Sequence, residues 1–87
     1  MNTLKASVLE LNYPCMWQYK AIGRDKSLLE RAINEIFAGC RCEIRYANSS
    51  RTGKYHSYAI DLEVSDDESR IGYYQLLNSH AHVLMVI

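Results

Sequence analysis

Apolar and polar residues alternate along several segments of the chain, and this alternation predicts strands. In the segment 15–22, the odd-numbered positions, among them Trp17 and Tyr19, share one face, while polar residues such as Lys20 lie on the other. A period of two is typical of a strand with one buried face. Alternation or a short apolar run predicts strands in further segments: 40–47, 56–64 and 83–87.

A helix is predicted between the first two strands. Apolar residues there recur at helical spacing: Leu28, Leu29, Ala32, Ile33, Ile36 and Phe37. The sequence Ser27-Leu28-Leu29-Glu30 has the form of a capping box, so we expect the helix to begin at Ser27. Gly39 is placed to end this helix in a left-handed conformation.

A second helix is predicted after the third strand. Ser65-Asp66-Asp67-Glu68 is another capping box, and its acidic residues suit the positive end of a helix dipole. The inward-facing stripe that we expect consists of Ile71, Tyr74 and Leu77, with Leu76 beside them. Gly72 weakens this helix, because glycine has a low helix propensity.

The order of elements is therefore strand, helix, strand, strand, helix, strand. With right-handed crossovers, this order packs as a ferredoxin-like sandwich. We predict an α+β fold with a four-stranded antiparallel sheet in the order 4-1-3-2 and two helices on one face of it. Residues 13–87 are expected to form this single ferredoxin-like domain, preceded by a loose N-terminal leader over residues 1–12.

The composition indicates one small globular domain. The chain has 87 residues, of which 48% are hydrophobic and 23% charged. Ten Lys and Arg residues balance ten Asp and Glu residues, which disfavours nucleic acid as a partner, since phosphate binding usually leaves a basic footprint. Three cysteines do not complete a disulfide framework, and the sequence shows no signal peptide and no membrane-spanning run. We therefore expect a cytoplasmic protein with no membrane contact.

Three parts of the sequence together resemble a known family. They are Tyr13-Pro14-Cys15 with the following Tyr19-Lys20 and Ile22-Gly23, the segment Ser49-Ser50-Arg51-Thr52-Gly53-Lys54-Tyr55-His56-Ser57, and the end Val83-Leu84-Met85-Val86-Ile87. The chain resembles the YbeD-like family of small bacterial proteins of unknown function. This resemblance implies a ferredoxin-like fold similar to that of the ACT domains, which regulate amino-acid metabolism. It implies a regulatory role by analogy, and it supplies no catalytic residue and no cofactor.

The segment 49–57 is the first candidate site. Its Ser and Gly residues, with Asn48 directly before it, are typical of a turn between two strands, and the simplest interpretation is a turn alone. The segment also carries exposed hydrogen-bond donors and two cations, which would suit an anion or an acidic partner. The candidate binding residues are Ser49, Ser50, Arg51, Gly53, Lys54, Tyr55 and Ser57. Thr52-Gly53-Lys54 is not a phosphate-binding P-loop, because a strand and not a helix follows it.

The second candidate site is the loop before the first helix. The N–H groups at a helix N-terminus attract anions, and basic side chains nearby would strengthen that attraction. The alternative anion seat therefore consists of Gly23, Arg24, Lys26 and Ser27.

The open face of the sheet is the third candidate, because both helices cover the opposite face. Met16, Leu84 and Val86 are expected to form an apolar patch on this face, which is compatible with a homodimer. The alternative is that Val8, Leu9 and Leu11 of the leader cover Leu84 and Val86.

Metal binding and catalysis find little support in the sequence. Cys40 and Cys42 with His80 and His82 suggest a zinc site, but the predicted topology puts them on opposite edges of the sheet, about 14 Å apart. No spacing assembles a catalytic set, so we expect a protein that is not an enzyme and has no cofactor. The prediction is a non-catalytic regulatory or binding module for a protein partner or a small anionic metabolite. The alternative is an RNA-binding protein that uses the open sheet face.

Overall fold

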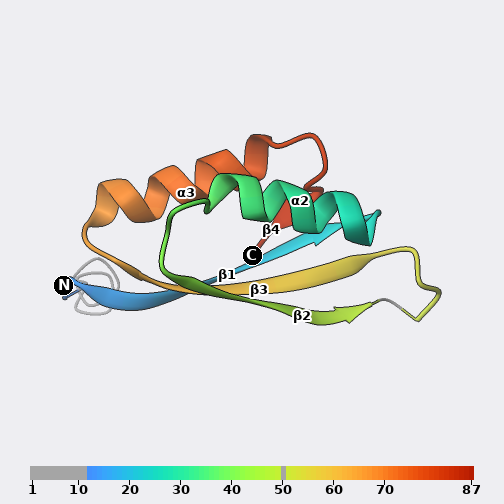
Figure 1. Ribbon diagram of the computed structural model, residues 1–87, viewed down its shortest axis with the longest axis horizontal. Coiled ribbons are helices and arrows are strands. Elements are labelled where there is room, and N and C mark those ends of the chain that lie inside the picture. The colour runs from blue at the N-terminus through green and yellow to red at the C-terminus, as the bar shows by residue number, and fades with distance from the viewer. Residues whose placement is uncertain (1–11, 50) are drawn as a thin grey trace, which may run out of the picture.

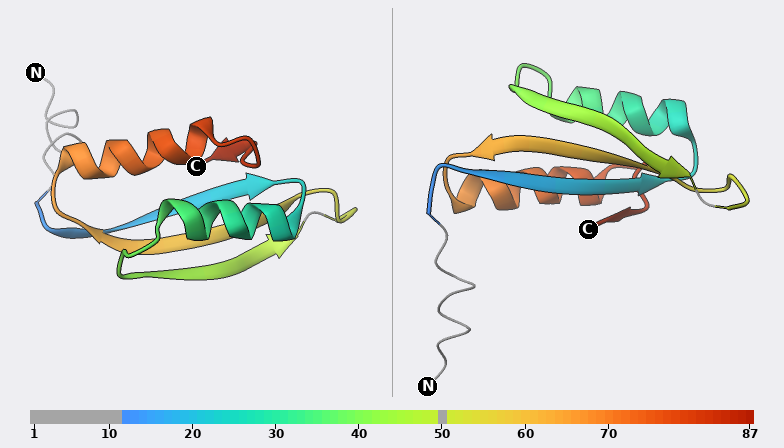
Figure 2. Two further views of the ribbon diagram at one scale, coloured as in Figure 1. Left: turned by 45° about the horizontal axis from the view of Figure 1, so that its top comes forward. Right: turned by 90° about the horizontal axis from the view of Figure 1, so that it is seen from below.

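A computed structural model describes residues 12–49 and 51–87. The elements follow in the order β1 (Cys15–Gly23), α2 (Lys26–Ile36), β2 (Cys42–Ser49), β3 (His56–Val64), α3 (Asp67–Ser79) and β4 (Met85–Val86). The strands form one antiparallel sheet in the order β2-β3-β1-β4, and both helices lie on the same face of it (Figures 1 and 2). The predicted order and the ferredoxin-like α+β fold are confirmed.

The core lies between the sheet and the helices. Alternation in β1 and β3 places Tyr19 and Ile60 on the covered face, and Leu29 and Ile33 of α2 pack against them. Each of these side chains is buried, and burying a residue of this size stabilises a fold by about 1.5–3 kcal/mol. The faces predicted for β1 and β3 are therefore confirmed.

Both helices begin at an aspartate and not at the predicted serine. The side chain of Asp25 accepts a hydrogen bond from the Leu28 N–H at 2.9 Å, and Asp66 accepts one from the Ser69 N–H at 2.8 Å. The predicted starts at Ser27 and Ser65 are wrong. Asp25, two residues before Ser27, caps α2, and Asp66, directly after Ser65, caps α3. A carboxylate cap also interacts favourably with the positive end of the helix.

Helix α3 turns a different side to the sheet from the one its sequence predicts. Leu77 is fully buried, but Ile71 and Tyr74 are 44% and 43% exposed. Tyr73 faces the core instead, and its ring stacks on Phe37 with the ring centres 4.9 Å apart. Apolar residues lie on both sides of α3, so the contact with Phe37 decides which side is buried.

Strand β4 is shorter than predicted and is shifted by one residue. Val86 pairs with Ala21 and lies in the core, whereas Met85 pairs with Ile22 on the open face. The expectation that Val86 lies on the open face is therefore wrong. A shift of one residue exchanges the two faces of a strand, and the pairing with β1 fixes the register here.

Two buried tyrosines make the stability of the fold depend on alkaline pH. Burial raises the pKa of Tyr19 to about 12, and burial followed by the hydrogen bond to Glu30 raises that of Tyr58 to about 12. The Tyr58 hydroxyl donates to the Glu30 carboxylate at 2.9 Å. The ordinary tyrosine pKa is about 10, so the unfolded chain loses these protons first. The free energy of unfolding therefore falls as the pH rises from about 10 to about 12.

We expect the free energy of unfolding of the Tyr58→Phe variant to fall less steeply with pH than that of the native protein between about pH 10 and about pH 12. The substitution removes one ionisable group and keeps the ring, at a cost of about 1 kcal/mol at neutral pH for the lost hydrogen bond. Urea unfolding at pH 8, 10, 11 and 12 measures the difference. Parallel curves for the two proteins would contradict the role of Tyr58.

Candidate functional site

Three connections meet at one end of the sheet. They are the loop between β1 and α2, the β2–β3 hairpin, and the turn between α3 and β4 (Figure 1). Gly23 at the end of β1 pairs with His56 at the start of β3, so the loop after Gly23 lies beside the hairpin. We call the residues 23–27, 51–56 and 80–84 the hairpin end. The two loops proposed from the sequence as separate sites are therefore neighbours.

Arg24 and Lys54 line one concavity at the hairpin end together with Tyr55. Its volume is about 340 Å³. Each cation comes from a different connection, and within the part of the chain that the structure describes neither forms an ion pair. A carboxylate or phosphate in this concavity would meet a guanidinium and an ammonium group, which together give charge-assisted hydrogen bonds.

The remaining cations of the two loops lie elsewhere. Arg51 is exposed in the turn, where Gly53 adopts the positive φ of 76° that the turn needs. The ammonium of Lys26 lies 4.5 Å from the centre of the Tyr46 ring, and the Tyr46 hydroxyl bonds Nδ1 of His56 at 2.9 Å. This cation–π contact holds the Lys26 ammonium against Tyr46 of β2, so Lys26 already has an interaction partner.

The other residues of the first two candidate sites have mainly structural surroundings. Ser49 ends β2, its backbone opposite His56, and Ser57 pairs with Ile22 inside the sheet. Ser27 is exposed in the first turn of α2. Ser50 lies outside the described residues. Since the Asp25 carboxylate already occupies an amide of this helix N-terminus, an anion here would depend on side chains and not on the helix amides.

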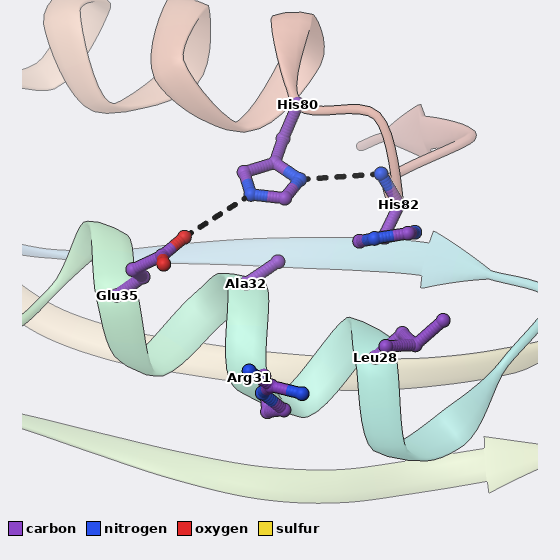
Figure 3. Close-up of a pocket in the computed structure, with 6 residues that line it drawn as sticks. All are labelled: Leu28, Arg31, Ala32, Glu35, His80 and His82. Atoms are coloured by element: carbon purple, nitrogen blue, oxygen red, sulfur yellow. Dashed lines mark hydrogen bonds and ion pairs between the residues drawn. The ribbon is translucent and has the colours of Figure 1, made fainter.

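A second concavity, of about 190 Å³, lies between α2 and the α3–β4 turn (Figure 3). Its lining residues are Leu28, Arg31, Ala32, Glu35, His80 and His82. Nε2 of His80 lies 3.4 Å from a carboxylate oxygen of Glu35, and Nδ1 of His80 accepts a hydrogen bond from the His82 N–H at 3.2 Å. These two contacts orient the His80 ring across the space between the helix and the turn.

A third concavity joins the other two. It has a volume of about 240 Å³ and is lined by Arg24, Asp25, Ala81, His82 and Leu84. It shares Arg24 with the concavity at Lys54, and it shares His82 with the concavity at Arg31. The sequence did not point to Arg31, and it suggested His82 only as a zinc ligand, because only the packing of the α3–β4 turn onto α2 brings these two residues together.

Gly23 allows this arrangement because the α3–β4 turn passes very close to it. A Cβ atom on Gly23 would lie 2.6 Å from the carbonyl oxygen of His82 and 3.2 Å from Cδ1 of Leu29. The contribution of Gly23 to the hairpin end is therefore close backbone packing.

The open face of the sheet carries a polar network and not the predicted apolar patch. Asp61 accepts a hydrogen bond from the Gln18 amide at 2.9 Å and pairs with Arg45 at 2.5 Å. The hydrogen bond from Arg45, and then that from Gln18, lower the pKa of Asp61. Met16 pairs with Glu63, at the end of β1 away from β4. Met16, Leu84 and Val86 therefore form no continuous patch, because β4 is too short to reach Met16 and Val86 is in the core.

Charge is unevenly distributed between the two ends of the sheet. The hairpin end carries four Lys and Arg residues, namely Arg24, Lys26, Arg51 and Lys54, and one acidic residue, Asp25. At the opposite end, β3 finishes and α3 begins with four acidic residues, Glu63, Asp66, Asp67 and Glu68, against two arginines, Arg41 and Arg70 (Figure 1). An acidic partner is thus attracted to the hairpin end and repelled from the other.

The fold and its open basic end define a small ferredoxin-like α+β protein. The chain belongs to the family described as "Protein of unknown function (DUF493)", whose model matches residues 9–87. This is the same family as the YbeD-like proteins, so the resemblance seen in the sequence is confirmed.

Relatives occur in two bacteria. The chain is 28% identical over 76 residues to the uncharacterized protein Cj0253 of Campylobacter jejuni, a match that covers 87% of each chain. It is 26% identical over 77 residues to an uncharacterized protein of Helicobacter pylori, covering 86% of this chain and 87% of the relative. A solution structure of protein HP0495 from H. pylori superimposes with a TM-score of 0.74 at 24% identity, covering 90% of this chain and 86% of that one.

Among the helices of the described residues, none has the length and apolar character needed to span a membrane.

Proposed function

We propose that this protein is a non-catalytic binding module of the cytoplasm that captures an acidic segment of a protein partner at its hairpin end. One observation carries the proposal. Arg24 and Lys54, from two connections far apart in the sequence, line the same concavity and have no ion-pair partner among the residues described. Two neighbouring cations without a counterion repel each other. A carboxylate that binds between them is attracted to both and relieves this repulsion.

The shape of the hairpin end favours a segment of a partner over a small metabolite. Sites for small ligands usually enclose them and orient them with a few buried polar groups. Within the described chain no polar or charged residue is buried, and the concavity at Arg24 is open to solvent. An open surface gains affinity from several contacts spread along a longer ligand.

The test measures binding of a fluorescent hexaglutamate peptide at low salt. An exposed ion pair contributes about 0.2–1 kcal/mol, so Arg24→Ala and Lys54→Ala should each weaken binding about 1.5-fold to fivefold. The matched control is Arg41→Ala, an exposed arginine just before β2, at the other end of the sheet. An equal loss in the control, or no binding by the native protein, would refute the proposal.

Two further probes distinguish the alternatives. Free glutamate and inorganic phosphate test a small anionic metabolite, and a single-stranded oligouridine tests RNA. Tighter binding of oligouridine with a steep salt dependence would favour the RNA alternative. The open sheet face does not support it, because Glu43, Asp61 and Glu63 stand where phosphates would lie.

A further inference from the structure

The three concavities of the hairpin end share residues, and their linings follow one another in a definite order. Lys54 and Arg24 line the first, Ala81 and Leu84 line the middle one together with Arg24 and His82, and the last contains Arg31. Cationic side chains therefore alternate with apolar ones along the surface that runs from the hairpin, past the α3–β4 turn, to α2.

Leu84 is the apolar residue at the centre of this surface. It is 51% exposed although it directly precedes β4, and its backbone N–H donates to the Ile22 carbonyl at 2.7 Å. This hydrogen bond fixes the backbone of Leu84 while much of its side chain remains in contact with water. An apolar side chain of a ligand could pack against the exposed part of Leu84 and remove it from water.

Arg31 is the cation at the far end. It is exposed on α2, one turn from Glu35, and within the described residues it takes part in no ion pair. Glu35 lies 3.4 Å from His80, so that carboxylate is directed towards the imidazole. Figure 3 shows Glu35 and His80 pointing towards each other while Arg31 lies apart from them. Arg31 is thus available to an anionic group from outside.

We propose that the ligand is an extended protein segment in which two acidic clusters flank apolar residues, and that it crosses the hairpin end from Lys54 and Arg24 over Leu84 to Arg31. The inference rests on the proposed function and specifies the partner of the same site. A continuous chain of phosphates is a poorer match, because Asp25 lines the middle concavity, where the proposed segment is apolar and a phosphate would be repelled.

The experiment compares three peptides of equal length. Glu-Glu-Leu-Leu-Glu-Glu has both clusters and the apolar centre, Glu-Glu-Ser-Ser-Glu-Glu has the same charge and a polar centre, and Glu-Glu-Ser-Ser-Ser-Ser has one cluster. We expect the second acidic cluster to tighten binding by about 1.5-fold to fivefold, as for one exposed ion pair, and the two leucines to tighten it by about threefold to tenfold. Leu84→Ser should remove only the gain from the leucines, and Arg31→Ala only the gain from the second cluster.

Two matched controls accompany these variants. Leu76→Ser replaces a leucine of similar exposure, 53%, on α3, and Arg41→Ala removes a cation from the other end of the sheet. Neither should alter the differences among the peptides. Far-ultraviolet circular dichroism and thermal melting confirm that every variant folds.

The outcomes separate this inference from the proposed function. If all three peptides bind equally and depend on Arg24 and Lys54, the acidic site stands and the extended path is wrong. If Leu84→Ser and Leu76→Ser lose the same affinity, the assignment of Leu84 is wrong. If none of the peptides binds, both proposals fail. If oligouridine binds more tightly than any of the peptides, the ligand of this surface is RNA and the proposed protein segment is wrong.

Discussion

Leu77→Ala is expected to lower the free energy of unfolding by about 2–5 kcal/mol, whereas Leu76→Ala should change it by no more than about 0.5 kcal/mol. The two leucines are adjacent in α3, but Leu77 is 0% exposed and Leu76 is 53% exposed. Truncating Leu77 removes apolar contacts and leaves a cavity between α3 and the sheet. Leu76 loses little, because water already surrounds much of its side chain.

Urea unfolding monitored by tryptophan fluorescence measures both values. The pair is matched in residue type, helix propensity and position, so the difference isolates burial. Because small domains have a net stability of about 5–15 kcal/mol, the Leu77 variant will retain only part of it. Equal losses at the two positions would mean that α3 is rotated about its axis, so that Leu77 does not face the sheet.

Gly23→Ala is the second substitution with a large expected effect, a loss of about 1–3 kcal/mol and a melting temperature lower by about 4–8 °C per kcal/mol. The new Cβ would lie 2.6 Å from the His82 carbonyl oxygen, so the α3–β4 turn must move. Hydrogen bonds oppose this movement on both sides of His82. The Val83 N–H donates to the His80 carbonyl at 3.1 Å, and the Leu84 N–H donates to that of Ile22 at 2.7 Å.

The matched control is Gly72→Ala in α3, where a Cβ would meet no atom within 4 Å. Alanine has the higher helix propensity, so this variant should be more stable by about 0.5–1 kcal/mol. If the close approach at Gly23 exists in solution, the melting temperature falls for Gly23→Ala and rises for Gly72→Ala, each relative to the native protein. A stable Gly23→Ala protein would show that the turn does not pack there.

The strands that meet the helix layer along most of their length were predictable from the sequence. β1 and β3 each bury one face, and their alternation therefore reports the fold directly through residues such as Tyr19 and Ile60. The same physical reason explains the prediction of α2, whose apolar residues occupy a single stripe that includes Leu29 and Ile33. In these elements, local pattern and tertiary contact agree.

The faces of α3 and β4 were not predictable, because contacts with other elements decide them. α3 has apolar residues on two sides, and the stacking of Tyr73 on Phe37 selects one of them. β4 consists of apolar residues on both faces, so only its register with Ala21 places Val86 in the core. A period of two carries no information when every residue in a strand is apolar.

The candidate site shows the same division. Arg24, Lys54 and Tyr55 were found individually, because loops with cations and turn residues are exposed. Their convergence depends on the antiparallel pairing that brings Gly23 opposite His56, which no local pattern contains. Arg31 was missed because a cation on a helix surface does not by itself suggest a site. His82 was considered only as a zinc ligand, because its sequence neighbourhood does not show that it packs beside α2.

The separation of charge between the two ends gives the described part of the molecule an electric dipole, although the formal net charge of the chain is zero. In the electric field of an acidic partner, this dipole orients the molecule so that the hairpin end points towards the partner before the two surfaces touch. Orientation during the encounter raises the association rate, because fewer collisions present the wrong end. Salt weakens the effect, since the Debye length is about 8 Å at physiological ionic strength, which is shorter than the sheet. A chain of zero net charge would thus approach the proposed acidic partner in a preferred direction.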